Sequence, residues 1–290
     1  MPEQNREWWI ERSGESRLHV RTWEDPAARG VVCVVHGLGD HAGRFEHVGR
    51  ALSARGLAVH SLDLPGHGRS EGPRGHIRGW SEFHDALAVL IARVHGDGDP
   101  RPLGLLGHSM GALVALDWAL ENPSRVRALV LSAPPFDLAM KPLVFKVWLA
   151  RIAEKVVPAL TQANQIPPSL LSHNPEVVRA HRADPLVHHR VSARLYIEYV
   201  RRRGRLFDRA RTLAVPTLVL QGGSDPVASA PAAVRFTERA PRGVATLRLY
   251  PGLFHEVLNE YEGPAILEEM GAWLEYALLA GAAAAPRVTG

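Results

Sequence analysis

The sequence predicts an α/β protein whose central sheet is mostly parallel and is covered by helices on both faces. Short apolar runs that read as buried strands alternate with helix-forming stretches such as 45–55, and this alternation is typical of a parallel sheet. The strand-like runs are 31–35, 58–62, 103–106, 128–131, 217–220 and 246–249. With 290 residues, of which 46% are hydrophobic, the chain can also bury one large core.

The alternation stops between residues 134 and 213, where the chain becomes rich in proline and in helix-forming residues. We interpret 135–212 as a helical cap inserted after the sixth strand, 1–134 and 213–280 as the core of the protein, and 281–290 as a disordered tail. The cap segment 142–160 is amphipathic, and its apolar members are Leu143, Val147, Trp148, Ile152, Val156 and Leu160. Its apolar side either closes an acyl channel above the sheet or, as we prefer for any single residue, packs onto the core.

The segment 107–111 fits the pattern Gly-x-Ser-x-Gly, which is typical of a nucleophile elbow. A serine on this sharp turn between a strand and a helix has strained backbone geometry, so small residues are needed two positions to either side. The apolar run before it and the helix-forming run 112–120 after it agree with that context. Ser109 is therefore the candidate nucleophile. The backbone N–H of Met110, at the start of the helix, is a candidate donor to an oxyanion.

The acid and the base of such a site follow the serine in the order Asp or Glu, then His. His255 is the candidate base, because it alone of the later histidines lies beyond the last strong strand signal, in a turn-rich loop. Asp225 is the preferred acid, since it stands just past the strand 217–221, where a short side chain can reach across the edge of the sheet. Asp137 remains the alternative, because related architectures sometimes supply the acid one strand earlier.

These residues together predict acyl transfer through a serine. His255 would take the proton of Ser109 as the serine attacks an ester carbonyl, while Asp225 would orient the imidazole, and water would then cleave the acyl-enzyme. A second oxyanion donor is expected after the strand 31–35, which runs into a His-Gly turn ordered by His36. The backbone N–H of Leu38 is the candidate.

Composition excludes several classes of protein. Residues 1–20 hold no apolar stretch long enough for a signal peptide, and no run in the chain approaches the roughly 20 apolar residues of a membrane-spanning helix. Cys33 is the single cysteine, so an internal disulfide and a thiolate metal site are excluded. The net charge is +4, and the basic run 201–205 lacks interleaved aromatic residues, so we expect a solvated helix end and no nucleic-acid partner. No ligand cluster follows the histidines of 36–41, which argues against a metal.

Longer blocks of sequence carry a resemblance to a known family. They read HGLGDHAGRF at 36–45, DLPGHGRSEG at 63–72 and YPGLFHEVLNE at 250–260, beside the elbow, with LSHNPEV at 171–177 and DPLVH at 184–188 in the cap. From about residue 8 to residue 278, the chain resembles the monoacylglycerol lipases of the α/β-hydrolase superfamily. The resemblance implies the α/β-hydrolase fold and the triad Ser109, Asp225 and His255. It also implies Leu38 and Met110 as oxyanion donors, a mobile cap that faces lipid, and no cofactor.

The reaction that the resemblance implies is hydrolysis of monoacylglycerols to fatty acid and glycerol. Lysophospholipids or simple carboxylic esters are alternative substrates, and acyl transfer to another alcohol is an alternative reaction. The intact triad argues against a non-catalytic binding protein of the same fold. The first cap helix and the stretch 161–166 match no block of the family, so the preferred chain length and headgroup stay open. We expect a cytoplasmic protein that binds a small lipid and whose cap can contact a membrane or micelle surface.

Overall fold

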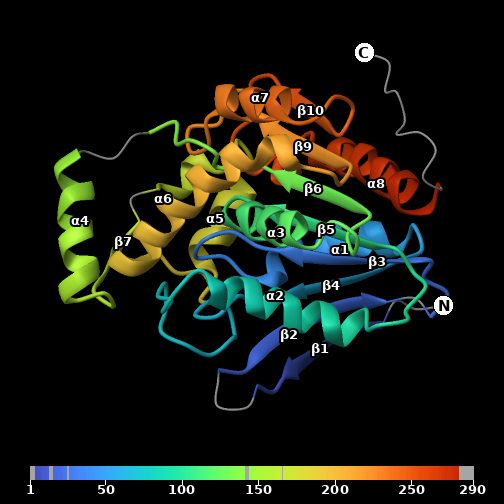
Figure 1. Ribbon diagram of the computed structural model, residues 1–290, viewed down its shortest axis with the longest axis horizontal. Coiled ribbons are helices and arrows are strands. Elements are labelled where there is room, and N and C mark those ends of the chain that lie inside the picture. The colour runs from blue at the N-terminus through green and yellow to red at the C-terminus, as the bar shows by residue number, and fades with distance from the viewer. Residues whose placement is uncertain (1–3, 13–15, 25, 141–143, 165, 281–290) are drawn as a thin grey trace.

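The computed structural model describes residues 4–12, 16–24, 26–140, 144–164 and 166–280. Within these residues an eight-stranded sheet forms the centre of the molecule (Figure 1). Its strands are β1 (Gln4–Ile10), β2 (Leu18–Glu24), β3 (Gly30–Val35), β4 (Leu57–Leu62), β5 (Leu103–His108), β6 (Ala128–Ser132), β9 (Thr217–Gly222) and β10 (Ala245–Tyr250). Their order across the sheet is β1-β2-β4-β3-β5-β6-β9-β10, and the six strands from β4 to β10 in this order pair in parallel. The predicted α/β class with a mostly parallel sheet is confirmed.

The first two strands, β1 and β2, were not predicted from the sequence. They pair antiparallel with each other, and β2 pairs antiparallel with β4. Polar side chains interrupt both strands, and two of them in β2, His19 and Thr22, are buried. Neither strand therefore shows the unbroken apolar run that marks a strand covered on both faces.

The apolar strands place alternate residues on opposite faces of the sheet, and each face is covered by helices. In β3, Val31, Cys33 and Val35 belong to one buried cluster, whereas Val32 and Val34 belong to the other. The first cluster contains residues of α2 (Ser81–Val94), α3 (Met110–Glu121) and α7 (Ala230–Arg239), and the second contains residues of α1 (Glu46–Ser53) and α8 (Gly263–Leu279). Burial of each of these valines contributes about 1.5–3 kcal/mol to folding.

The chain between β6 and β9 forms a smaller layer of helices. It contains α4 (Val144–Val156), α5 (Pro175–Ala183) and α6 (Ala193–Asp208), and an antiparallel ribbon of β7 (Thr161–Ala163) and β8 (Arg190–Ser192) that was not predicted. Short 3-10 helices lie at η1 (Ala42–Phe45), η2 (Pro168–Leu170), η3 (Arg209–Thr212) and η4 (Val257–Asn259). The basic run 201–205 lies within α6 and is not simply a solvated helix end, because Arg202 forms an ion pair of 3.1 Å with the buried Asp117 of α3.

The helix α4 is the least covered part of this layer, and Figure 1 shows it at the left edge, beyond α6. The helix was predicted within 142–160, but the preferred packing of its apolar residues onto the core is wrong. Trp148 is 60% exposed, Ile152 43% and Val156 73%, so this side does not pack onto the core. Leu143 and the side chain of Val147 lie outside the described residues, as does the tail 281–290. No helix in the described part of the chain is both long and apolar enough to cross a bilayer.

Candidate active site

The nucleophile elbow has the geometry that its sequence predicts. Ser109 follows the last residue of β5 and precedes the first residue of α3, with φ of 52° and ψ of −123°. A serine in this left-handed region is strained and is held there by its surroundings. A Cβ atom at Gly107 would collide with the backbone of Gly111, and one at Gly111 would collide with the backbone of Val35. The two glycines therefore allow the elbow to approach β3 closely.

The structure brings the three predicted triad residues together at the carboxyl edge of the sheet. Nε2 of His255 lies 3.0 Å from Oγ of Ser109, and its Nδ1 lies 2.8 Å from Oδ2 of Asp225. Asp225 and His255 follow the ends of β9 and β10, so all three side chains stand on loops that leave parallel strands at one edge. Asp137, the alternative acid, instead accepts a hydrogen bond from the N–H of Leu138 and lies 3.8 Å from Arg203.

The Asp225 carboxylate is fixed by donors other than the histidine. Its Oδ1 accepts hydrogen bonds from the N–H groups of Val227, at 2.8 Å, and Ala228, at 2.9 Å. Its Oδ2 accepts another from Nε2 of Gln221, at 2.9 Å. Burial raises the pKa of Asp225, but His255 and these N–H donors more than offset that effect, so its pKa is lowered. The acid is thus held ionised beside the imidazole.

The His255 ring is buried, yet it is a stronger base than an ordinary histidine. Burial lowers the pKa of His255, while the Asp225 carboxylate, its hydrogen bond and Glu256 raise it, and the net shift is upward. His108, whose ring centre lies 5.1 Å from that of His255, behaves in the opposite way. Burial and the neighbouring His255 lower the pKa of His108 to about 4, so this second histidine stays neutral and leaves the charge on His255.

The turn after β3 lies next to the elbow. His36 orders this turn, because its Nδ1 lies 2.7 Å from the carbonyl oxygen of Gly37 and its Nε2 accepts a hydrogen bond of 2.9 Å from the N–H of Leu64. A Cβ atom added to Gly37 would stand 3.2 Å from Cβ of Ser109, and Leu38 lines the same pocket as the serine. Met110 is the first residue of α3 and follows Ser109 directly in the chain, whereas Leu38 lies near the serine in space.

Comparison with known proteins identifies the family. A family model described as "serine aminopeptidase, S33" matches residues 26–262. The chain belongs to this family. It is 34% identical to a monoacylglycerol lipase of Mycolicibacterium smegmatis, over 90% of this chain and 94% of that protein, and 30% identical to the human monoglyceride lipase, over 93% and 90%. A solved structure of a Paleococcus ferrophilus monoacylglycerol lipase is also similar, with a TM-score of 0.83 and 30% identity over 90% of this chain and 99% of that one.

In this S33-family hydrolase, the cavity at the serine is small and is lined by both polar and apolar side chains. It holds about 60 Å³, far below the roughly 300–1,000 Å³ of a typical small-molecule site. Its lining from the layer above the sheet includes Asn164, Ile166, Leu171, His181, His188 and His189, none of which belongs to α4. The apolar acyl channel beneath α4, which was the alternative reading of this helix, is therefore not what the structure shows beside Ser109.

A buried ion-pair network beside His255 was missed by the sequence analysis. Arg44 binds both oxygens of Glu256, at 2.8 and 2.7 Å, and lies 3.3 Å from Asp40. Burial raises the pKa of Glu256, but the Arg44 guanidinium lowers it by more, so the carboxylate stays charged. The signal was present in the block 36–45, which supplies Asp40 and Arg44, but nothing in the sequence shows that Glu256 faces them.

The site offers no sign of a metal centre. Among the residues that the structure describes, no group of three or more His, Cys, Asp or Glu side chains is arranged to hold a metal ion. Cys33 lies in β3 and is fully buried, and burial raises the pKa of its thiol. This thiol is therefore a packed side chain of the core.

Proposed function

We propose that this protein hydrolyses the ester bond of monoacylglycerols to fatty acid and glycerol, with Ser109 as the nucleophile. The observation that carries the proposal is the hydrogen-bonded chain from Ser109 through His255 to Asp225, beside a small cavity that Ser109 and His255 line. The family and the monoacylglycerol lipases among its relatives support both the ester chemistry and the substrate class.

The geometry suits a two-step reaction through an acyl-enzyme. His255 accepts the proton of Ser109 as Oγ attacks the ester carbonyl, and it returns that proton to the departing glycerol oxygen. The N–H groups of Leu38 and Met110 donate to the oxyanion of the tetrahedral intermediate, and each such donor can contribute about 3–4 kcal/mol. A water molecule, deprotonated by His255, then releases the fatty acid and frees Ser109.

The charge of the pocket favours a neutral headgroup over a phosphate. Arg44 is the only arginine or lysine among the described residues that line it, and Asp40 and Glu256 already neutralise it. Burial lowers the pKa of His181, and lowers that of His188 to about 4, so both rings are neutral at pH 7. The pocket therefore offers hydrogen-bonding groups suited to hydroxyls and lacks a free cation for a lysophospholipid phosphate.

We also propose that residues 135–212 act as a cap that moves to admit the acyl chain. The cavity of about 60 Å³ cannot hold a long chain, and Ile166 and Leu171 of this region line it. Displacement of Ile166 would enlarge this cavity and make room for an acyl chain beside Ser109.

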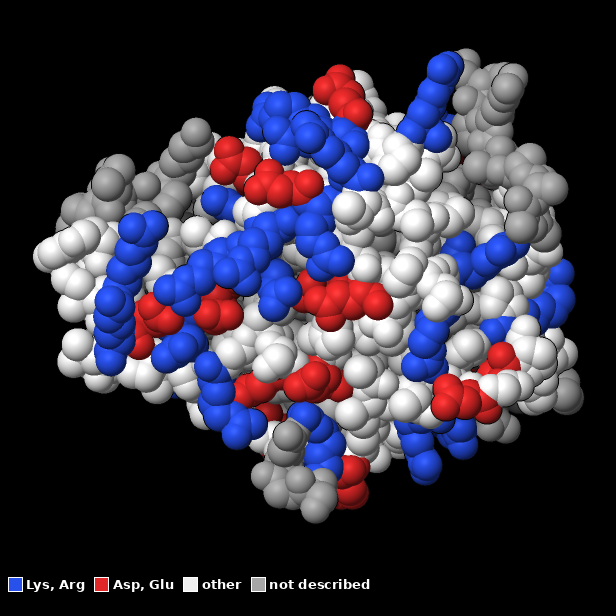
Figure 2. Space-filling view, viewed as in Figure 1, with Lys and Arg blue, Asp and Glu red and all other residues white. Residues whose placement is uncertain are grey.

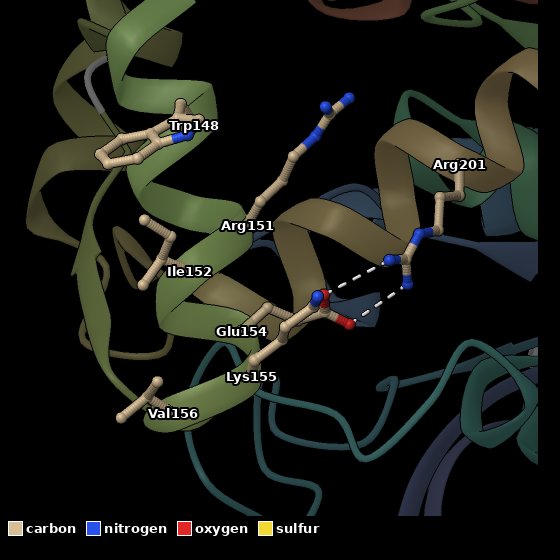
Figure 3. Close-up of a pocket in the computed structure, with 7 residues that line it drawn as sticks. All are labelled: Trp148, Arg151, Ile152, Glu154, Lys155, Val156 and Arg201. Carbon is tan, nitrogen blue, oxygen red and sulfur yellow. Dashed lines mark hydrogen bonds and ion pairs between the residues drawn. The ribbon is translucent and has the colours of Figure 1, made fainter.

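The exposed side of α4 is suited to a lipid surface. Figure 3 shows Trp148, Ile152 and Val156 projecting from one side of the helix, while Glu154 on the other side binds Arg201 of α6 at 3.2 and 3.3 Å. Figure 2 shows arginine and lysine side chains gathered over α6 and α4. Exposed basic residues there are Arg151, Lys155, Arg201 and Arg205. An apolar ridge with flanking positive charge can insert into the headgroup region of an anionic bilayer.

Co-sedimentation with vesicles tests this contact. Wild type should bind phosphatidylglycerol vesicles, and the double variant Trp148→Glu, Val156→Glu should lose most of that binding because it places two charges at the membrane interface. The matched control is Tyr261→Glu in the turn before α8, where Tyr261 is 66% exposed and lies outside α4. Equal binding of all three proteins would overturn the contact while leaving the catalytic proposal intact.

The function itself is tested by product release. Glycerol is measured from monoacylglycerols of several chain lengths, with di- and triacylglycerols, lysophospholipid and p-nitrophenyl esters for comparison. We expect monoacylglycerols to react fastest, and Ser109→Ala to lose about 10⁶-fold in kcat. Equal activity of the wild type and Ser109→Ala would refute the role of Ser109 as the nucleophile. A preference for lysophospholipid would refute the proposed neutral glycerol headgroup.

A further inference from the structure

The carboxylate of Glu260 is buried just after the catalytic histidine loop and is saturated with hydrogen-bond donors. Its side chain has no exposed surface. Oε2 accepts hydrogen bonds from Oγ of Ser172, at 3.0 Å, and from the N–H of His173, at 2.8 Å. Oε1 lies 2.9 Å from Nδ1 of His173 and accepts another hydrogen bond, also of 2.9 Å, from the N–H of Phe254. Charged hydrogen bonds of this kind fix geometry more tightly than neutral ones.

These contacts hold the backbone on both sides of His255. On one side, Phe254 donates to Glu260, and its ring stacks on the ring of His173 with the centres 3.7 Å apart. On the other side, the N–H of Glu256 donates to the carbonyl oxygen of Leu171 at 2.8 Å. We call Glu260, Leu171, Ser172 and His173 the Glu260 clasp. Three of its four residues come from the segment between η2 and α5, which belongs to the layer above the sheet.

We propose that Glu260 is a positioning residue for the reaction, which places His255 against Ser109 by clasping its loop to residues 171–173. The proposal rests on the proposed role of Ser109 and His255. Glu260 does not touch the reacting atoms, and it acts through the backbone of Phe254 and through the cap segment. This segment is consequently part of the frame of the triad, and any opening of the cap must occur elsewhere, in α4 and in the chain that leads to Ile166.

A purely structural role would not require this arrangement. Burial of a carboxylate is costly, and well-packed apolar residues can join two segments at least as stably. Four directed hydrogen bonds give orientation in addition to stability. Because a shift of about 1 Å in a catalytic group can lower a rate by about a hundredfold, a modest loosening of this loop should appear in kcat before it appears in substrate binding.

The test compares Glu260→Gln with wild type. Glutamine keeps the volume and one acceptor oxygen, but its amide nitrogen cannot accept the bonds that one carboxylate oxygen accepts. We expect kcat to fall about tenfold to a hundredfold with KM unchanged. The loss should be equal for a long-chain monoacylglycerol and for p-nitrophenyl acetate, since His255 serves both. The rate at which a fluorophosphonate labels the enzyme should fall by the same factor, because the Ser109 Oγ–P bond forms, and fluoride leaves, only as His255 takes the proton.

Two controls separate positioning from general stability. Glu269→Gln makes the same change in a glutamate of α8 that binds Tyr250 and Arg248 outside the clasp, and it should leave kcat unchanged. In the His255→Ala background, adding Glu260→Gln should not lower the residual rate further, because residues that act as a unit are not additive. A further equal loss in that background would assign Glu260 a merely structural role.

Smaller changes keep the test available if Glu260→Gln does not fold. Ser172→Ala removes one donor, and His173→Phe keeps the stacking on Phe254 but removes the ring donor. Each should lower kcat and leave KM unchanged, with folding checked by thermal unfolding. A rise in KM alone, or an unchanged kcat, would overturn the clasp. If wild type and Ser109→Ala were labelled equally, the proposed function would fail instead, so the two failures are distinguishable.

Discussion

Two parts of the helical layer between β6 and β9, the segment 171–173 and the helix α4, are attached to the molecule in different ways. The segment 171–173 is hydrogen-bonded to the catalytic histidine loop through Glu260 and through the backbone of Glu256. The helix α4 contacts mainly α6, and most of its described apolar side chains face solvent. Apolar area that is left exposed contributes nothing to folding, and contiguous exposed apolar area typically marks an interaction site. We propose that the 171–173 segment serves the chemistry and that α4 serves contact with lipid.

This difference also predicts where the layer opens. Regions with few buried contacts open with small free energies, whereas regions that share hydrogen bonds with the core open only with the core. The helix α4 has an exposed apolar side, and its Glu154 forms an ion pair with Arg201, whose side chain is half exposed. The 171–173 segment shares a buried carboxylate with the triad loop. Opening at α4 would leave the triad assembled.

The largest loss of activity among the variants below should come from replacing Asp225, the acid of the triad. Replacing Asp137, the alternative acid, should cause no such loss. Asp225→Asn should lower kcat about 10⁴-fold, because an amide favours the wrong tautomer of the histidine. Asp137→Asn is the matched control and should retain nearly full activity, since Asp137 faces Arg203. Steady-state hydrolysis of a p-nitrophenyl ester measures both. Comparable losses in the two variants would contradict the geometry of the triad.

Stability should separate the buried and exposed parts of the same layer. Leu206 of α6 is fully buried, and Leu206→Ala should lower the free energy of unfolding by about 2–5 kcal/mol through lost contacts and a cavity. Ile152→Ala removes a similar volume from the exposed side of α4 and should cost less than about 0.5 kcal/mol. Urea unfolding followed by circular dichroism provides both values. An equal cost at the two positions would show that α4 is buried in solution.

The parts of the fold that could be predicted are those specified by local pattern. The run 30–35 is buried on both faces, so its unbroken apolar sequence predicts a central strand. β1, at the edge of the sheet, and β2, its neighbour, were missed, because strands interrupted by polar residues carry no such pattern. Amphipathicity predicted the helix α4, but the preferred packing of its apolar side onto the core is wrong. An apolar side is also consistent with a channel or a membrane, and only tertiary structure distinguishes these surroundings.

The residues of the site also fall into those that the sequence could predict and those that it could not. Ser109, Asp225 and His255 each stand just past a strand, in a turn whose residue types carry a signal, so their proximity could be expected from the order of the strands. The Glu260 clasp could not, because Ser172 and Glu260 are 88 residues apart in sequence and meet only through the tertiary fold. The same holds for Arg44 and Glu256, which are 212 residues apart.

The pH dependence of kcat/KM should show whether the charged network around His255 contributes to the pKa of this histidine. Neutral His255 is the active base, so kcat/KM is lost as pH falls through the pKa of His255, which stands above its ordinary value partly because of Glu256. Glu256→Gln removes that contribution and leaves Arg44 paired with Asp40 alone. The acidic limb of the profile should therefore move to lower pH. A limb that stays in place would show that Asp225 sets this pKa without help.

The smallest effect should be found at the ion pair that joins α4 to α6. Arg201 is half exposed while its partner Glu154 is nearly buried, so solvent screening should limit the contribution of the pair to about 1 kcal/mol or less. Arg201→Met keeps the length of the side chain and removes the charge. We expect amide exchange in 148–157 to accelerate without a measurable change in global unfolding, and the hydrolysis of p-nitrophenyl acetate to stay at the wild-type rate. Faster exchange in 171–173 as well would show that this segment and α4 open together, which would contradict the difference between them.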